Sequence, residues 1–195
     1  MKIGVKHFTY AKYVSGGAGS AVTYSGGTMT TDKTVHVDYT VERDDQSFYA
    51  DDHRIEHSNT VTGCSVTIEL ATLTAAMMKD ILGWQQVGST DVYQETGDEA
   101  PYVGCGWAVP VKEDGSLKYR GVWVYKVQFG LDSDSVNTKG QNLEYQTETI
   151  TGAGMAVTLA SGGSDVYRAV MTAGASLAAV DTWLNTQAGI SSGGP

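Results

Sequence analysis

A pair of histidines four positions apart is the strongest hint of chemistry in this sequence. His53 and His57, with Glu56 between them, match the HxxEH pattern of inverted zinc peptidases. On a helix such histidines share one face and can hold zinc, while the glutamate acts as general base. Residues 43–60 show no apolar stripe at helical spacing, and no later glutamate is an obvious third ligand. We therefore expect a polar surface segment without zinc.

Two adjacent aspartates form the second candidate. Asp51 and Asp52 follow Tyr49 and Ala50, as in the YxDD box with which reverse transcriptases hold two metal ions. A polymerase needs a larger chain than these 195 residues and a basic surface for its template. Phosphate-binding glycine patterns and the G-x-S-x-G nucleophile motif do not occur in the sequence. The sequence predicts a protein that is not an enzyme and binds no cofactor or metal.

The net charge argues against tight binding to nucleic acid. Asp and Glu number 22 against 13 Lys and Arg, which gives a net charge of −9, and the basic residues form no run. Proteins that hold DNA or RNA displace counterions from phosphates with basic patches. An acidic chain is expected to repel DNA that it meets.

The hydrophobic pattern is mostly that of β-strands. Apolar and polar residues alternate from Val35 to Val41, from Ser65 to Leu70 and from Val103 to Val109. A period of two is typical of a half-buried strand, and Asp114-Gly115 predicts a tight turn. We expect a mainly β fold, an antiparallel β-sandwich or small barrel, with one packed α-helix and a second short C-terminal helix.

Two segments have helical periodicity instead. Leu73, Met77 and Ile81 predict a helix over residues 73–82, with Thr72 or Thr74 as N-cap and Gly83 as its end. Within residues 175–187, apolar side chains at helical spacing predict the second helix: Leu177, Val180 and Leu184.

Several details of the remaining strands can also be predicted. Residues 122–129 form a dense strand with aromatic side chains on one face, namely Trp123, Tyr125 and Phe129. Turn-forming residues predict a turn at 25–27 and a polar loop over 131–142, and alternation predicts strands over 143–151 and 155–159.

An acidic segment, residues 42–60, interrupts this pattern and is expected to be a long exposed loop or hairpin. Such long polar segments in compact domains are usually functional or disordered. We expect it to contact a neighbouring subunit or ring, with simple disorder as the alternative. Its acidic residues are the candidate contact residues: Glu42, Asp44, Asp45, Asp51, Asp52 and Glu56.

The two cysteines, Cys64 and Cys105, lie in hydrophobic, strand-like stretches and are expected to be buried free thiols. No apolar run suggests a signal peptide or a membrane anchor, so we expect folding in a cytoplasm. We predict a single domain over residues 1–190 and a disordered tail over residues 191–195.

Five stretches, in this order, resemble the major tail protein family of siphophages, the phages with long non-contractile tails. They are YADD at 49–52, ATLTAAMMKDILG at 71–83, APYVGCGW at 100–107, YRGVWVYKVQF at 119–129, and TKG at 138–140 with YQTETITG at 145–152. The C-terminal DVYRAV and the helix with Trp183 are similar to the usual end of that family.

The resemblance implies a β-sandwich subunit of the tail tube. Six copies are expected to form a ring, with inner strands joined into a continuous β-barrel, and rings to stack around a tape-measure protein. The tube, located in the virion tail, would conduct double-stranded DNA without binding it specifically. The alternatives are another virion component, such as a tail terminator or a decoration protein, or a bacterial secretion tube subunit. A small zinc hydrolase using His53, Glu56 and His57 is the remaining alternative.

Overall fold

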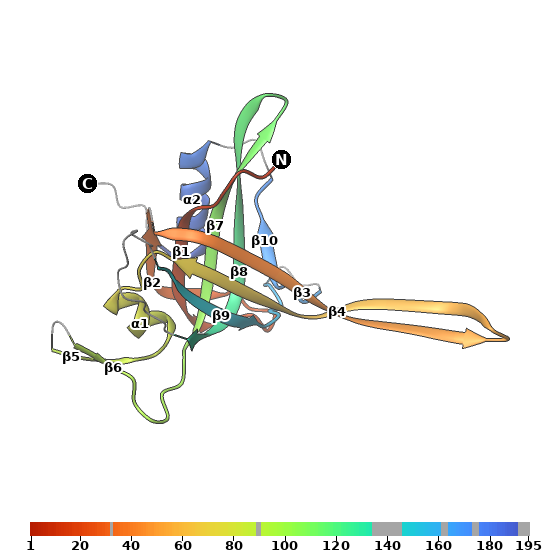
Figure 1. Ribbon diagram of the computed structural model, residues 1–195, viewed down its shortest axis with the longest axis horizontal. Helices are drawn as coiled ribbons and strands as arrows, with labels where there is room; N and C mark the ends of the chain where they lie inside the picture. The colour runs from red at the N-terminus through yellow and green to blue at the C-terminus, as the bar shows by residue number, and fades with distance from the viewer. Residues whose placement is uncertain (32, 89–90, 134–145, 161–163, 173–175, 191–195) are drawn as a thin grey trace, which may run out of the picture.

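The computed structural model describes residues 1–31, 33–88, 91–133, 146–160, 164–172 and 176–190. The strands and helices, in chain order, are β1 (Lys6–Ser15), β2 (Thr23–Thr30), β3 (Thr34–Ala50), β4 (His53–Leu70), α1 (Ala75–Ile81), β5 (Gln85–Val87), β6 (Asp91–Tyr93), β7 (Tyr102–Glu113), β8 (Ser116–Ser133), β9 (Glu148–Gly154), β10 (Arg168–Val170) and α2 (Leu177–Gln187). The prediction of a mainly β fold with two helices is confirmed (Figure 1).

One large antiparallel sheet dominates the molecule. It has eight strands, in the order β2-β1-β7-β8-β9-β4-β3, and β10 pairs with β8 beside this path. The short strands β5 and β6 form a separate hairpin. In the described part of the chain the path is open, with β2 and β3 as its ends. Of the two predicted architectures, a sandwich with open edges therefore fits better than a closed barrel.

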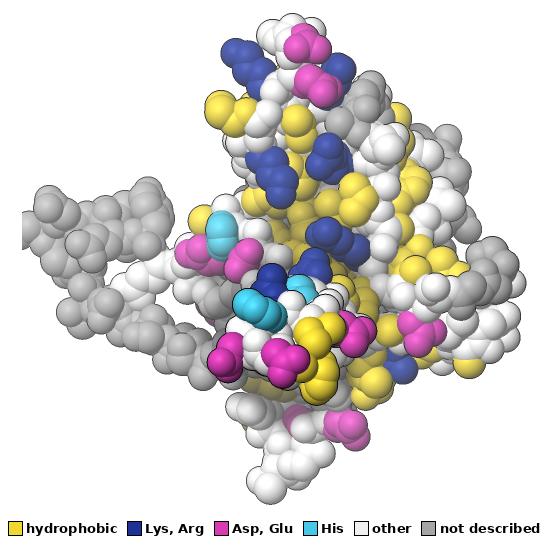
Figure 2. Space-filling model, turned by 90° about the vertical axis from the view of Figure 1, so that its right-hand side faces the viewer, with side chains coloured by type: hydrophobic (Ala, Val, Ile, Leu, Met, Phe, Trp, Pro, Cys, Tyr) yellow, Lys and Arg dark blue, Asp and Glu magenta, His cyan; other side chains and the backbone are white. Residues whose placement is uncertain are grey.

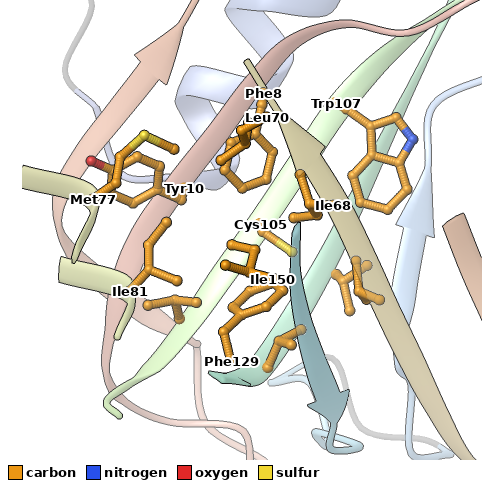
Figure 3. Packing of buried hydrophobic residues seen from close by; sticks show 14 of the residues in the cluster. Phe8, Tyr10, Ile68, Leu70, Met77, Ile81, Cys105, Trp107, Phe129 and Ile150 are labelled. Atoms are coloured by element: carbon orange, nitrogen blue, oxygen red, sulfur yellow. The ribbon is translucent and has the colours of Figure 1, made fainter. Parts of the chain in front are cut away.

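The main core lies where this sheet bends over itself. The wall formed by β1, β7 and β8 faces the wall formed by β9, β4 and β3, and α1 closes one end (Figures 1 and 3). Side chains from both walls and from α1 are fully or almost fully buried here, among them Phe8, Tyr10, Ile68, Leu70, Met77, Ile81, Cys105, Phe129 and Ile150. The alternation predicted for residues 65–70 and 103–109 is confirmed.

A second, smaller core forms on the opposite side of β7 and β8, under α2. Trp123, Val180 and Leu184 are fully buried in it. Glycines make the close approach of helix and sheet possible: a Cβ built on Gly121 would lie 2.7 Å from the Trp183 ring, and one on Gly106 would lie 2.8 Å from Leu184. The predicted C-terminal helix is therefore a structural cover of the sheet.

A β-bulge in β8 places its aromatic residues on two different faces, contrary to the prediction. Cys105 pairs with Val124 but Val103 pairs with Val127, so Tyr125 and Lys126 together face one residue of β7. The extra residue reverses the alternation. Trp123 and Tyr125 therefore point to the core under α2, whereas Phe129 points to the main core. The prediction that all three aromatics share a face is wrong.

Both helices begin at hydroxyl caps. The Thr74 side chain accepts a hydrogen bond from the Met77 amide at 3.3 Å, which selects Thr74 over Thr72, and Gly83 follows α1 with a φ of +78°. Ser176 caps α2 in the same way. The first helix is shorter than the predicted 73–82. The second helix was predicted to begin at residue 175, which lies outside the described residues.

Other predicted details are corrected or fall outside the described residues. The residues 25–27 lie within β2, where a register shift opposite β1 replaces the predicted turn. Val35 sits at a register shift of β3 and is exposed, unlike Val37 and Tyr39. Residues 155–159 contribute isolated bridges rather than a strand. Residues 134–145, with most of the predicted polar loop, and the predicted tail 191–195 lie outside the described residues.

Neither helix in the described part of the chain is long and apolar enough to cross a lipid bilayer.

Candidate functional site

The acidic segment singled out by the sequence is the outer half of the β3–β4 hairpin. Residues 42–62, which we call the arm, leave the body, and all of them are exposed except half-buried Ala50. The strands stay paired out to Ala50 and His53 (Figure 1). At about 3.4 Å per residue, the arm extends roughly 27 Å from Glu42 to Ala50. The hairpin alternative is confirmed and the loop alternative is wrong.

The tip of the arm explains the paired aspartates. Asp51 and Asp52 are the two residues between the last paired positions, and their φ angles are 49° and 60°. Positive φ at both central residues defines a type I′ turn, which suits the right-handed twist of a hairpin and which Asp tolerates better than most residues. These aspartates therefore shape a turn, and among the described residues they belong to no group of three or more metal-ligating side chains.

The histidines of the HxxEH pattern lie on a strand. His53 and His57 belong to β4, where four residues span roughly 13 Å. Zinc–nitrogen bonds of about 2.0–2.1 Å cannot bridge that separation. His57 instead contacts Asp45 at 3.1 Å and Ser47 at 3.2 Å across the hairpin. No group of three or more metal-ligating side chains gathers within the described residues.

Polar pairs across and along the strands hold the arm in shape. The Arg43 guanidinium donates to the Asn59 side chain at 2.8 Å, and the Gln46 amide donates to Asp44 at 2.9 Å. Cross-strand pairs of this kind stabilise a hairpin modestly. The arm thus has a defined shape although no core lies beneath it.

The arm is strongly acidic. Its six carboxylates, the candidate residues Glu42, Asp44, Asp45, Asp51, Asp52 and Glu56, exceed its two cations, Arg43 and Arg54, so its formal charge is 2 − 6 = −4. Among the described residues, Asp45 is the member of this set that contacts a basic side chain, the imidazole of His57 at 3.1 Å. The other carboxylates remain available to an external cationic surface.

Large hydrophobic side chains share the arm with these acids. Phe48 is 64% exposed, Tyr49 61% and Ile55 65%. A register shift beside Phe48 leaves Ile55 as an extra residue on β4. Isolated exposed apolar residues are ordinary, but three large ones gathered on a protruding element are typical of a contact surface.

A groove at the root of the arm carries the opposite charge. It has a volume of about 260 Å³ and lies between the N-terminal segment, β3, the β7–β8 hairpin and β10. Its cations are Lys2, Arg120 and Arg168, and Asp38 is its acidic residue. Its walls are partly apolar, with Val5, Val37, Tyr39, Trp107, Val109, Val122 and Val170.

The cations of this groove have few partners inside the subunit. The ion pairs of the described residues do not include Lys2, Arg120 or Arg168. The Arg120 Nε atom is buried and finds no hydrogen-bond acceptor among the described residues. Figure 2 looks onto the arm tip and shows a column of Lys and Arg side chains on the body above it.

The two thiols are buried and free, as predicted. Burial raises the pKa of Cys105, and burial also raises the pKa of Cys64. Both thiols are therefore protonated at neutral pH and poor nucleophiles. They belong to the core.

No family model matches this chain, and no curated protein matches it.

The groove is the functional candidate that the sequence did not reveal. Lys2, Arg120 and Arg168 lie far apart in the chain and stand in no basic run. Only the pairing of β10 with β8, and of Lys2 with Val111, brings them together.

Proposed function

We propose that this chain is the repeating subunit of a siphophage tail tube. Six copies would form a ring, and rings would stack around a tape-measure protein together with other tail proteins. The tube would conduct double-stranded DNA without binding it specifically. On this proposal the protein is a structural component of the virion tail, made in the host bacterial cytoplasm, and acts without catalysis or cofactor.

The arm is the observation that carries the proposal. A two-stranded hairpin alone is at best marginally stable in water. This arm nevertheless exposes Phe48, Tyr49 and Ile55 well away from the body's core. Burying these side chains against another subunit would contribute about 25 cal/mol per Å² of apolar surface. An arm of this kind suits a protein whose working state is an assembly.

The open edges of the sheet agree with a ring. The strands β2 and β3 end the strand path in the described part of the chain. Exposed edges invite pairing with another chain unless they are blocked. A contact between two different edges is heterologous, and heterologous contacts close into rings or continue into filaments. The resemblance implies that such edges join into the inner barrel of a tube.

Electron microscopy of the purified protein, alone and with its tail partners, tests the proposal. We expect hexameric rings and stacked tubes. A protein that stays monomeric in light scattering at all concentrations, and shows no rings with its partners, would overturn it. Single rings that never stack would indicate a terminator instead of a tube subunit.

A further inference from the structure

We propose that the basic groove at the root of the arm receives the acidic arm tip of a second copy of this chain. This inference rests on the proposed function and deepens it, because it names the two surfaces that join neighbouring subunits.

Charge complementarity is the first argument. Three cations and one carboxylate give the groove a formal charge of 3 − 1 = +2, and the arm carries −4. Both surfaces belong to a chain whose net charge is −9, so two copies repel each other in most orientations. Complementary patches on mutually repelling molecules select one orientation of approach.

The groove cations also lack ion-pair partners inside the subunit. None of the ion pairs among the described residues includes Lys2, Arg120 or Arg168. A carboxylate from another copy is the acceptor that suits a guanidinium best. The Arg168 guanidinium stacks on the Tyr39 ring at 4.4 Å, which holds a second cation at the groove without neutralising it.

Apolar surface matches as well. Among the apolar residues that line the groove, Val170 is 45% exposed and offers contact surface, whereas Trp107 and Val122 are largely buried in the main core. The arm tip offers Phe48 and Ile55 beside its carboxylates. A central apolar contact surrounded by charged pairs is the usual anatomy of a specific interface.

The occupant has to come from another copy. The arm's own root lines the groove through Val37 and Tyr39, and the strand continues in paired register to Ala50. Eleven residues at about 3.4 Å place the tip roughly 37 Å from that root. The arm therefore reaches a neighbour's groove and not its own, which makes the contact heterologous and able to propagate.

A photo-cross-linking experiment locates the docking site. The variant Phe48→benzoylphenylalanine in the full chain, irradiated under assembly conditions, should give dimers whose cross-linked peptides contain residues 1–5, 120–122 or 168–170 of the second copy. The same label at Val87, an exposed residue of β5 away from the groove and the arm, serves as a control for random collisions. Cross-links from position 48 that map elsewhere would overturn the inference.

Charge reversal with rescue tests the electrostatic match. The groove variant Lys2→Glu/Arg168→Glu and the arm-tip variant Asp52→Asn/Glu56→Lys, in which Asn keeps the turn conformation, should each weaken self-association at least about tenfold in sedimentation velocity. The combined fourfold variant restores opposite charges and should associate again. The variant Lys33→Glu/Lys79→Glu changes the net charge equally near α1 and should associate normally.

The outcomes separate this inference from the proposed function. Tubes that form normally from the groove variant would overturn the docking site and leave the tube proposal standing. A wild-type protein that never assembles or cross-links would overturn both. Because Arg168→Glu can disturb β10, the circular dichroism spectrum of each variant is compared with that of wild type. If the groove variant misfolds, the cross-linking experiment, in which the groove is unaltered, decides the question.

Discussion

The guanidinium of Arg168 lies 4.4 Å from the centre of the Tyr39 ring. This contact ties the short strand β10, which enters the sheet only beside β8, to the root of the arm on β3. Both residues line the groove, so this contact holds β10 against β3 there, three residues before the arm begins at Glu42.

The change Arg168→Gln should lower the free energy of unfolding by about 0.5–1 kcal/mol, because it removes a cation–π contact at a partly exposed site. Urea denaturation measures the change. In a Tyr39→Leu background the same substitution should cost almost nothing. Additive effects of the two substitutions would mean that the contact does not stabilise the protein.

Replacing residues 46–58 with Asn-Gly should leave a folded body that cannot polymerise. Asp45 and Asn59 are paired across the hairpin, so a two-residue type I′ turn fits between them. The removed side chains are exposed apart from half-buried Ala50, so thermal stability should change by less than about 1 kcal/mol. Calorimetry and electron microscopy provide the readouts. The variant Gln46→Ala/Ser58→Ala, which keeps the arm, is the matched control. Normal tubes from the shortened variant would show that the arm is not an assembly element.

The double variant His53→Ala/His57→Ala should keep the free energy of unfolding within about 1 kcal/mol of wild type, as for ordinary surface changes. The strand separates the two imidazoles too widely for one zinc ion. Metal analysis of the wild-type protein should find no stoichiometric zinc, and peptidase assays no activity. Tightly bound zinc that disappears in the double variant would restore the hydrolase alternative.

Stability should fall at alkaline pH because of Cys105. Burial raises the pKa of this thiol in the folded protein, while in the unfolded chain it is about 8.5. The stabilising contribution is therefore complete below about pH 8.5 and is lost above it, by about 1.4 kcal/mol per pH unit. Urea unfolding at several alkaline pH values measures the slope. Cys105→Ala should make that slope shallower, and an unchanged slope would assign it to other groups.

If this chain forms a tube that conducts DNA, the inner wall of that tube should be net acidic or neutral. Six copies multiply each lumen residue by six, so one inward lysine per subunit would become a strong trap for DNA. If the groove cations lie in subunit contacts, they are removed from the lumen. A structure of the assembled tube, with the charges on its inner wall counted, provides the check, and a net basic wall would contradict the prediction.

Much of the fold could be predicted because local patterns agreed with tertiary structure. The alternation of Val66, Ile68 and Leu70 and the spacing of Leu73, Met77 and Ile81 each marked a buried face. The face of Phe129 could not be predicted, since a bulge at Tyr125 and Lys126 inserts one residue without a distinctive local sequence. The helical spacing of Val180 and Leu184 predicted α2, although not which side of the sheet it covers.

Of the two parts of the candidate site, the sequence predicted the arm but not the groove. A run of acids with few apolar residues marked the arm, because such a composition cannot be buried. The same composition suggested a loop, since strand alternation is visible only when one face is buried, and neither face of the arm is. The groove depends on long-range pairing of Arg168 with Val124 and of Lys2 with Val111, which no local pattern encodes.

The strand order has a consequence for the time at which the protein can fold. The sheet joins β1 to β7 and β4 to β9, and the main core unites Phe8 with Ile150. Such distant pairings fold slowly, and a ribosome adds only about 5–20 residues per second. The core cannot close until β9 has been synthesised, whereas the arm is made long before. During synthesis, the exposed apolar side chains Phe48 and Ile55 therefore emerge before the rest of the core exists. Charged residues beside apolar segments reduce aggregation, and the carboxylates of the arm are placed to have this effect on the nascent chain.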